Sequence, residues 1–255
     1  MTTQHETQVL KIVSQAGRIL VESGAEISRV EQTMEIMGHT AGVPVNGYVT
    51  LTAVFASLAE EPVTQLTKTK VGSFNLQKVD EVNALSRDFV AGKMDFDGVV
   101  QRLNEIDRHV IDFNWPTKII GAGFVSIAPM LLFKATALDL GLAFFIGIAG
   151  YLAAQGMQRI AKTPYIKEVV GGMVIALLAI LLAKVQLGLS SDYMIVSAVM
   201  PLVPGVAITN SLREILAGHI ISGLVRIVDA LLIAAAIGGG VVLGSVIWGL
   251  FGGGL

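Results

Sequence analysis

The sequence predicts an α-helical membrane protein with five transmembrane helices, preceded by a small soluble α/β domain that combines helices with a β-hairpin. The 255 residues are 53% hydrophobic and 15% charged, and their mean hydropathy is +0.68, which is more apolar than an ordinary globular domain. Charged residues are spread as far as about Asp112, whereas long apolar stretches follow Trp115. We therefore expect a cytosolic α/β domain over residues 1–115 and a five-span transmembrane domain over residues 116–255.

The first part of the chain is expected to form four amphipathic helices, because apolar residues recur there every three or four positions. Gly24 stands where a left-handed cap should end the first helix, and Ser28 and Glu31 have the spacing of a capping box at the start of the second. The four predicted helices cover residues 9–20, 27–37, 76–89 and 96–106.

Between the second and third helices, the pattern is that of a β-hairpin. Val49, Leu51, Ala53 and Phe55 alternate with Tyr48, Thr50, Thr52 and Val54, which predicts one strand with one face buried. The Glu-Glu-Pro sequence at residues 60–62 turns the chain, and VTQLTKTK is then the returning strand.

The second half contains five apolar stretches that are long enough to cross a hydrocarbon core of roughly 30 Å, for which ~17–25 residues are needed. They cover residues 117–133, 138–158, 169–187, 193–208 and 230–251. Glycines are frequent in these stretches, and small residues allow membrane helices to pack closely. A helical bundle in the lipid bilayer or an oligomer is therefore expected.

Basic residues predict the orientation, because lysine and arginine concentrate in cytoplasmic connections. The connections after the second and fourth spans are the more basic ones, and the opposite connections hold one lysine each. The residues concerned are Arg159, Lys162, Lys167, Arg213 and Arg226 on the first side, and Lys134 and Lys184 on the other. We expect a cytoplasmic N-terminus and a C-terminus outside.

The fourth span is interrupted in the sequence MPLVPGVAITNSLR, residues 200–213. Proline removes a backbone donor and clashes with the preceding turn, and exposed backbone groups at membrane depth survive only next to protein or a watery cavity. The break is either a simple proline kink or a place for a solute or a gate. The substrate or gating candidates here and downstream are Pro204, Gly205, Thr209, Asn210, Arg213, His219 and Arg226.

A second group of candidates is the soluble-domain motif Gly24, Ala25, Glu26 and Arg29. Glu26 and Arg29 are three residues apart, which predicts a solvated ion pair on one helix face; a docking or gating element is the alternative. The segment GHIISGLVR, residues 218–226, predicts a short interfacial helix, with contact to the soluble domain as the alternative.

Composition argues against several function classes. A net charge of -2 with no basic block gives no nucleic-acid footprint, and the lack of cysteine excludes disulfides and thiolate metal sites. His39, His109 and His219 are scattered, and the chain has neither a phosphate-binding glycine loop nor GxSxG around Ser57. We expect no catalytic residues, no cofactor and no metal site.

The order of these motifs resembles the threonine/serine exporter family over nearly the whole chain. The residues that carry the resemblance are SGAEISRVEQTMEIMGHTAGV, the hairpin with TKTK, VPG in the fourth span and GHIISGLVR after it. Long members of that family carry a second block of spans on the same chain. This sequence therefore resembles the larger subunit of the split two-chain form, the enteric succinate-exporter type.

The resemblance implies a secondary transporter in the bacterial inner membrane that exports threonine and serine or a dicarboxylate such as succinate. It further implies coupling to the proton gradient and a small membrane subunit as partner. The alternative is a membrane-anchored enzyme or sensor whose activity resides in the soluble domain around Glu26, His39 and the hairpin.

Overall fold

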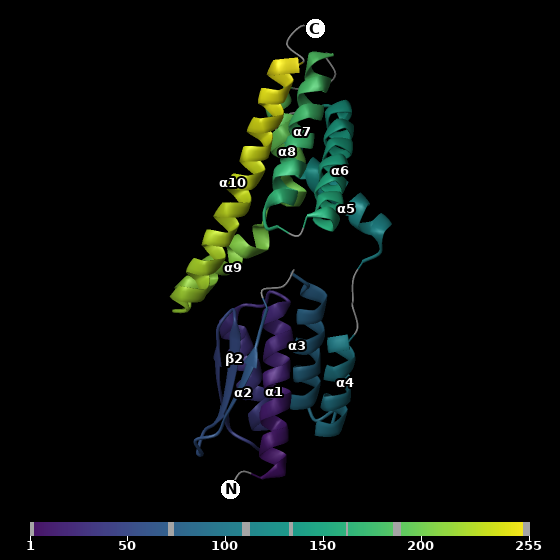
Figure 1. Ribbon diagram of the computed structural model, residues 1–255. Helices are drawn as coiled ribbons and strands as arrows, with labels where there is room; N and C mark the ends of the chain where they lie inside the picture. The colour runs from purple at the N-terminus through teal and green to yellow at the C-terminus, as the bar shows by residue number, and fades with distance from the viewer. Residues whose placement is uncertain are drawn as a thin grey trace. The chain divides into compact units, whose positions relative to one another are not determined.

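The computed structural model describes residues 3–70, 74–108, 113–132, 135–161, 163–185 and 190–251. His109, Lys134 and Lys162, and the ends of two predicted spans at Phe133 and Leu187, lie outside these residues. The chain forms two compact units (Figure 1), one of Met1–Asp112 with Val206–Ile227 and the other of Phe113–Gly205 with Val228–Leu255. The first unit therefore includes a segment from the C-terminal half of the sequence.

The first unit contains the four predicted helices, which are confirmed as α1 (Gln4–Glu22), α2 (Ile27–Thr40), α3 (Leu76–Val90) and α4 (Phe96–Arg108). α1 packs against the sheet and against the other helices (Figure 1). Its apolar face forms the centre of the core, in which Val9, Ala16 and Leu20 are almost completely buried. Gly24, Gly42 and Gly92 follow three of the helices with φ values of +87°, +77° and +67°, as expected of glycines just beyond a helix end.

The β structure is a three-stranded antiparallel sheet with the order β1 (Val45–Val49), β2 (Ala53–Leu58), β3 (Thr64–Lys68). The hairpin from β2 to β3 through Pro62 is confirmed, but the prediction of one strand from Tyr48 to Phe55 is wrong. Thr50 exchanges hydrogen bonds with Ala53, with its N–H donating to the Ala53 carbonyl at 2.8 Å and its Oγ1 accepting from the Ala53 N–H at 3.0 Å. This turn reverses the chain, so that Tyr48 pairs with Phe55.

The predicted capping box at the start of α2 is also wrong. Glu26 is the N-cap residue and makes no capping hydrogen bond, so Ser28 and Glu31 already lie inside the helix. The Ser28 hydroxyl donates to Glu26 Oε1 at 2.9 Å, and Glu31 Oε1 accepts from the Val49 N–H of β1 at 2.9 Å. Glu31 therefore ties α2 to the sheet.

The second unit consists of apolar helices. The long helices are α6 (Ala137–Ile160), α7 (Ile166–Lys184) and most of α10 (Ile220–Phe251). Two shorter helices are each followed by a 3-10 helix: α5 (Trp115–Ile127) by η1 (Ala128–Leu132), and α8 (Ser191–Ala198) by η2 (Met200–Leu202). Four described helices are long and apolar enough to cross a membrane, namely Trp115–Leu132, Ala137–Ile160, Ile166–Lys184 and Ile220–Phe251. The chain is thus built as a multi-pass membrane protein.

The predicted interruption of the fourth span is confirmed. η2 ends at Leu202, Val203 has an extended backbone with φ -69° and ψ 129°, and α9 (Gly205–Leu216) begins after Pro204. The two helical pieces on either side of the break make a fifth span only if the bent pair crosses the membrane as one. The structure therefore supports four or five spans.

Candidate functional site

Within the first unit, α9 and the first turns of α10 form a tight helical hairpin. Gly218 adopts a φ of +90° at the turn, and the His219 N–H donates to the Glu214 carbonyl at 2.8 Å. A side chain at Gly223 would meet the Ser211 carbonyl, so α10 needs a glycine there to lie close against α9. This hairpin brings Glu214 and Arg226 together.

Glu214 and Arg226 form a buried ion pair. Arg226 Nε lies 3.0 Å from Glu214 Oε1 and 3.2 Å from Oε2, and the two residues are 0% and 8% exposed. The Arg226 Nη2 donates to the Ala25 carbonyl at 3.1 Å. The ion pair therefore also holds the backbone just before α2.

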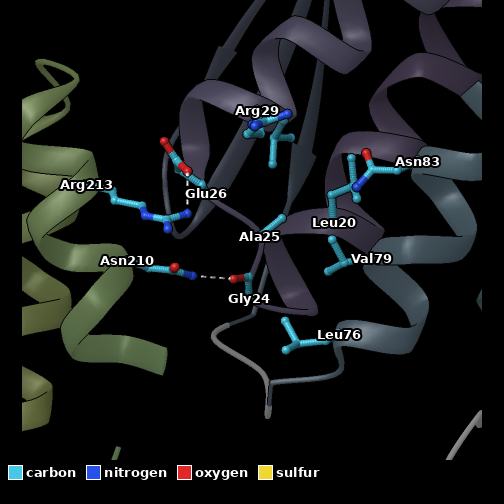
Figure 2. Close-up of a pocket in the computed structure, with 11 residues that line it drawn as sticks. Leu20, Gly24, Ala25, Glu26, Arg29, Leu76, Val79, Asn83, Asn210 and Arg213 are labelled. Atoms are coloured by element: carbon cyan, nitrogen blue, oxygen red, sulfur yellow. Dashed lines mark hydrogen bonds and ion pairs between the residues drawn. The ribbon is translucent and has the colours of Figure 1, made fainter. Parts of the chain in front are cut away.

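The backbone before α2 is held by a second contact from α9. Asn210 Nδ2 donates to the Gly24 carbonyl at 2.9 Å (Figure 2), so side chains of α9 and α10 bind the consecutive carbonyls of Gly24 and Ala25. Gly24 has a positive φ, and a Cβ there would run into the Phe74 ring. Glycine is therefore required at this position both for conformation and for space.

Two acid–base pairs surround these contacts. Arg213 Nη1 lies 4.0 Å from Glu26 Oε2, and the Arg213 side chain is 65% exposed. His219 Nε2 lies 3.4 Å from Glu31 Oε2. In each pair the basic side chain comes from the α9–α10 hairpin, and the acidic side chain comes from α2 or its N-cap residue.

The predicted ion pair between Glu26 and Arg29 is wrong: Glu26 instead contacts Ser28 and Arg213. Glu26 is the N-cap residue, with φ -70° and ψ 132°, and it therefore stands outside the helical periodicity that would place it on one face with Arg29. The prediction of a separate short helix over residues 218–226 is wrong too, because Ile220 begins the 32-residue α10. The alternative, contact with the soluble domain, is confirmed by the hydrogen bond from Arg226 to the Ala25 carbonyl.

A cavity of about 260 Å³ lies beside these contacts (Figure 2). Its lining contains both the soluble-domain motif and two residues of α9. The polar members are Glu26, Arg29, Asn83, Asn210 and Arg213, and the apolar ones include Leu20, Val30, Leu76 and Val79.

The structure thus brings together most residues from the two groups of sequence candidates. Pro204 and Gly205 belong to the second unit, and Thr209 is exposed on α9 and is not part of the cavity lining. Glu214 was not predicted as a site residue. The sequence feature that could have indicated Glu214 is a carboxylate within a largely apolar helix. Its partner Arg226 lies twelve residues further on, and only the turn at Gly218 brings the two side chains together.

Gly24→Ala is expected to destabilise the first unit by about 1–3 kcal/mol, through strain at positive φ and overpacking against Phe74. Gly42→Ala is the matched control, because Gly42 also has a positive φ but nothing lies within 4 Å of the position that a Cβ would take there. Denaturant titration of both variants measures the difference. Equal losses would show that the Phe74 contact contributes nothing.

The described residues contain no group of three His, Cys, Asp or Glu side chains placed to hold a metal ion. No curated protein and no solved structure matches the chain. A family model for threonine/serine exporters, ThrE, matches residues 11–248. This range includes the cavity residues and the candidate spans, apart from the last three residues of the span Ile220–Phe251. The chain therefore belongs to the ThrE family of threonine/serine exporters.

Proposed function

We propose that the chain is the larger subunit of a two-chain secondary transporter in the bacterial inner membrane, which exports threonine and serine or a dicarboxylate such as succinate. The family match across nearly the whole chain, together with four or five candidate spans, carries this proposal. A small membrane subunit completes the transporter, the proton gradient drives export, and the N-terminus is cytoplasmic with the C-terminus outside.

The break at Pro204 is the gating element in this proposal. The extended Val203 and the proline interrupt backbone hydrogen bonding between η2 and α9, and broken helices are where membrane transporters bind solutes or move. α9 follows the break directly and carries Asn210, which binds the Gly24 carbonyl. Movement at the break is therefore transmitted along the chain to the site in the first unit.

Glu168 is the proposed proton carrier. It stands in the first turn of α7, is 7% exposed, and has one oxygen 3.6 Å from Lys167 Nζ. Among the described residues, its Oε2 has no hydrogen-bond partner. Ionisable side chains buried in membrane helices are costly and mark ion or proton pathways.

Liposomes that contain the purified chain, with and without the proposed small membrane subunit, test the proposal. Efflux of labelled threonine, serine and succinate is measured with and without a pH gradient. Gradient-dependent efflux of at least one of them, in the presence of the subunit, is expected. No flux of any of the three, combined with substrate turnover by the protein, would favour an enzyme instead.

Glu168→Gln is expected to remove the effect of the pH gradient and leave downhill exchange intact, because the amide fills the same space but carries no titratable proton. Glu105→Gln is the control, since its side chain is 63% exposed on α4. The ratio of efflux rates with and without the gradient is the measurement. A gradient response in Glu168→Gln equal to that of the wild type would remove this residue from the coupling pathway.

Pro204→Ala is expected to lower the efflux rate about tenfold or more while expression is retained, because alanine allows the helix to continue through the break. Initial efflux rates, normalised to the amount of reconstituted protein, check this. Unchanged efflux would show that the interruption is a structural kink without a role in gating.

A further inference from the structure

The cavity in the first unit has the size of a site for a small metabolite. Its volume of about 260 Å³ lies below the roughly 300–1,000 Å³ of pockets that hold drug-sized ligands. Leu20, Val30, Leu76 and Val79 supply an apolar wall, and polar side chains from α2, α3 and α9 enter from other sides (Figure 2). Such a mixture of apolar wall and few polar groups is typical of a specific small-molecule site.

Arg29 is the cavity residue that most clearly lacks a partner. Over the described ranges, its guanidinium group makes no hydrogen bond or ion pair, and only its backbone carbonyl is used, by Thr33. Arg213 lines the same cavity from α9 and lies at the limit of an ion pair with Glu26, at 4.0 Å. Guanidinium groups bind carboxylates or phosphates through paired N–H donors.

The carboxylate of Glu26 favours a ligand with a carboxylate over a ligand with a phosphate. Two guanidinium groups and one carboxylate give the lining a net charge of only +1, and a phosphate with nearly two negative charges would meet Glu26 as well. A ligand with one carboxylate and one ammonium group satisfies all three side chains. The amide of Asn83 adds a donor and an acceptor for a further polar group of the ligand.

We propose that this cavity binds a small α-amino acid, whose carboxylate pairs with Arg29 and Arg213 and whose ammonium group pairs with Glu26. Because Arg29 belongs to α2 and Arg213 belongs to α9, the bound amino acid links the two helices. The site therefore senses the cytosolic amino acid and stabilises α9 against α2 when its concentration is high. That the sensed amino acid is also the exported one rests on the proposed function.

Calorimetric titration of the full-length protein in detergent with threonine, in the absence of any gradient, tests the proposal. Arg29→Gln is expected to weaken threonine binding about tenfold or more, since a charge-assisted hydrogen bond is lost. Arg29 is exposed and has no partner among the described residues, so the variant should fold. Arg87→Gln on α3 is the control, because that side chain is 68% exposed and does not line the cavity.

Ligand variants test each proposed contact. Threoninol lacks the carboxylate and is expected not to bind, and succinate and inorganic phosphate, which lack the ammonium group, are expected to bind more weakly than threonine. In Glu26→Gln, threonine should bind more weakly and succinate more tightly than in the wild type. Tighter binding of succinate or phosphate than of threonine by the wild type would overturn the assignment.

The outcome of the binding experiment can be distinguished from the outcome of the efflux experiment. Threonine efflux from liposomes without Arg29-dependent binding would leave the proposed function standing and refute the cavity site. Arg29-dependent threonine binding without any efflux would support the cavity site and refute the transport proposal. Equal threonine affinity in Arg29→Gln and in the wild type would place any binding elsewhere in the chain.

Discussion

Replacement of Glu214 by alanine is expected to lower the free energy of unfolding by about 3–5 kcal/mol, because it leaves Arg226 as an unpaired buried charge. Glu214 is fully buried and Arg226 is 8% exposed, so water cannot readily replace the lost partner. Denaturant titration of the full-length protein in detergent measures the loss.

Two further variants separate the buried charge from a general effect of the substitution. Arg213→Ala is expected to cost only about 0–1 kcal/mol, because its ion pair is long and its side chain is 65% exposed. The double variant Glu214→Met with Arg226→Leu should be more stable than Glu214→Ala, since no buried charge is left without a partner. A loss below about 1 kcal/mol in Glu214→Ala would contradict the pairing.

Sequence periodicity predicted those parts of the fold that depend on local interactions. The helices of the first unit and the glycines at 24, 42 and 92 follow from apolar spacing and backbone preference. The break at Pro204 follows from the chemistry of proline. In each case the determining residues lie within one or two turns of the feature that they produce.

The errors arose where alternation or spacing was compatible with more than one backbone path. The residues from Tyr48 to Phe55 alternate as a strand does, but the side chain of Thr50 stabilises a turn in their middle. Ser28 and Glu31 have capping-box spacing, but α2 begins before them, at Ile27. The local sequence pattern does not distinguish a strand from a turn at Thr50, and it does not show which residue begins α2.

The sequence predicts the candidate site residues as two separate groups, but it does not predict that the two groups lie together in the folded protein. The hydrogen bond from Asn210 to the Gly24 carbonyl joins residues 186 positions apart. No periodicity within either segment contains that contact. In the folded first unit it lies next to the hydrogen bond from Arg226 to the Ala25 carbonyl, which joins residues 201 positions apart.

In the second unit, Gly240→Ala is expected to be the most damaging single substitution in α10. A Cβ at Gly240 would lie within 3 Å of the Val169 backbone, at 2.8 Å from its carbonyl carbon and 2.9 Å from its Cα. A backbone cannot yield as a flexible side chain can, so α7 and α10 must move apart. The expected loss of stability is about 1–3 kcal/mol or more, with a corresponding fall in the amount of folded protein in the membrane.

Gly239→Ala is the matched control on the same helix, because a Cβ there meets nothing within 4 Å. It should leave stability unchanged or raise it slightly, since alanine favours helix more than glycine does. Thermal unfolding of both variants in the same detergent compares them directly. Since Gly172 also lets α7 approach α10, at the Ile237 carbonyl, Gly172→Ala should resemble Gly240→Ala. Equal stability of the Gly239 and Gly240 variants would mean that α7 and α10 do not pack through these glycines.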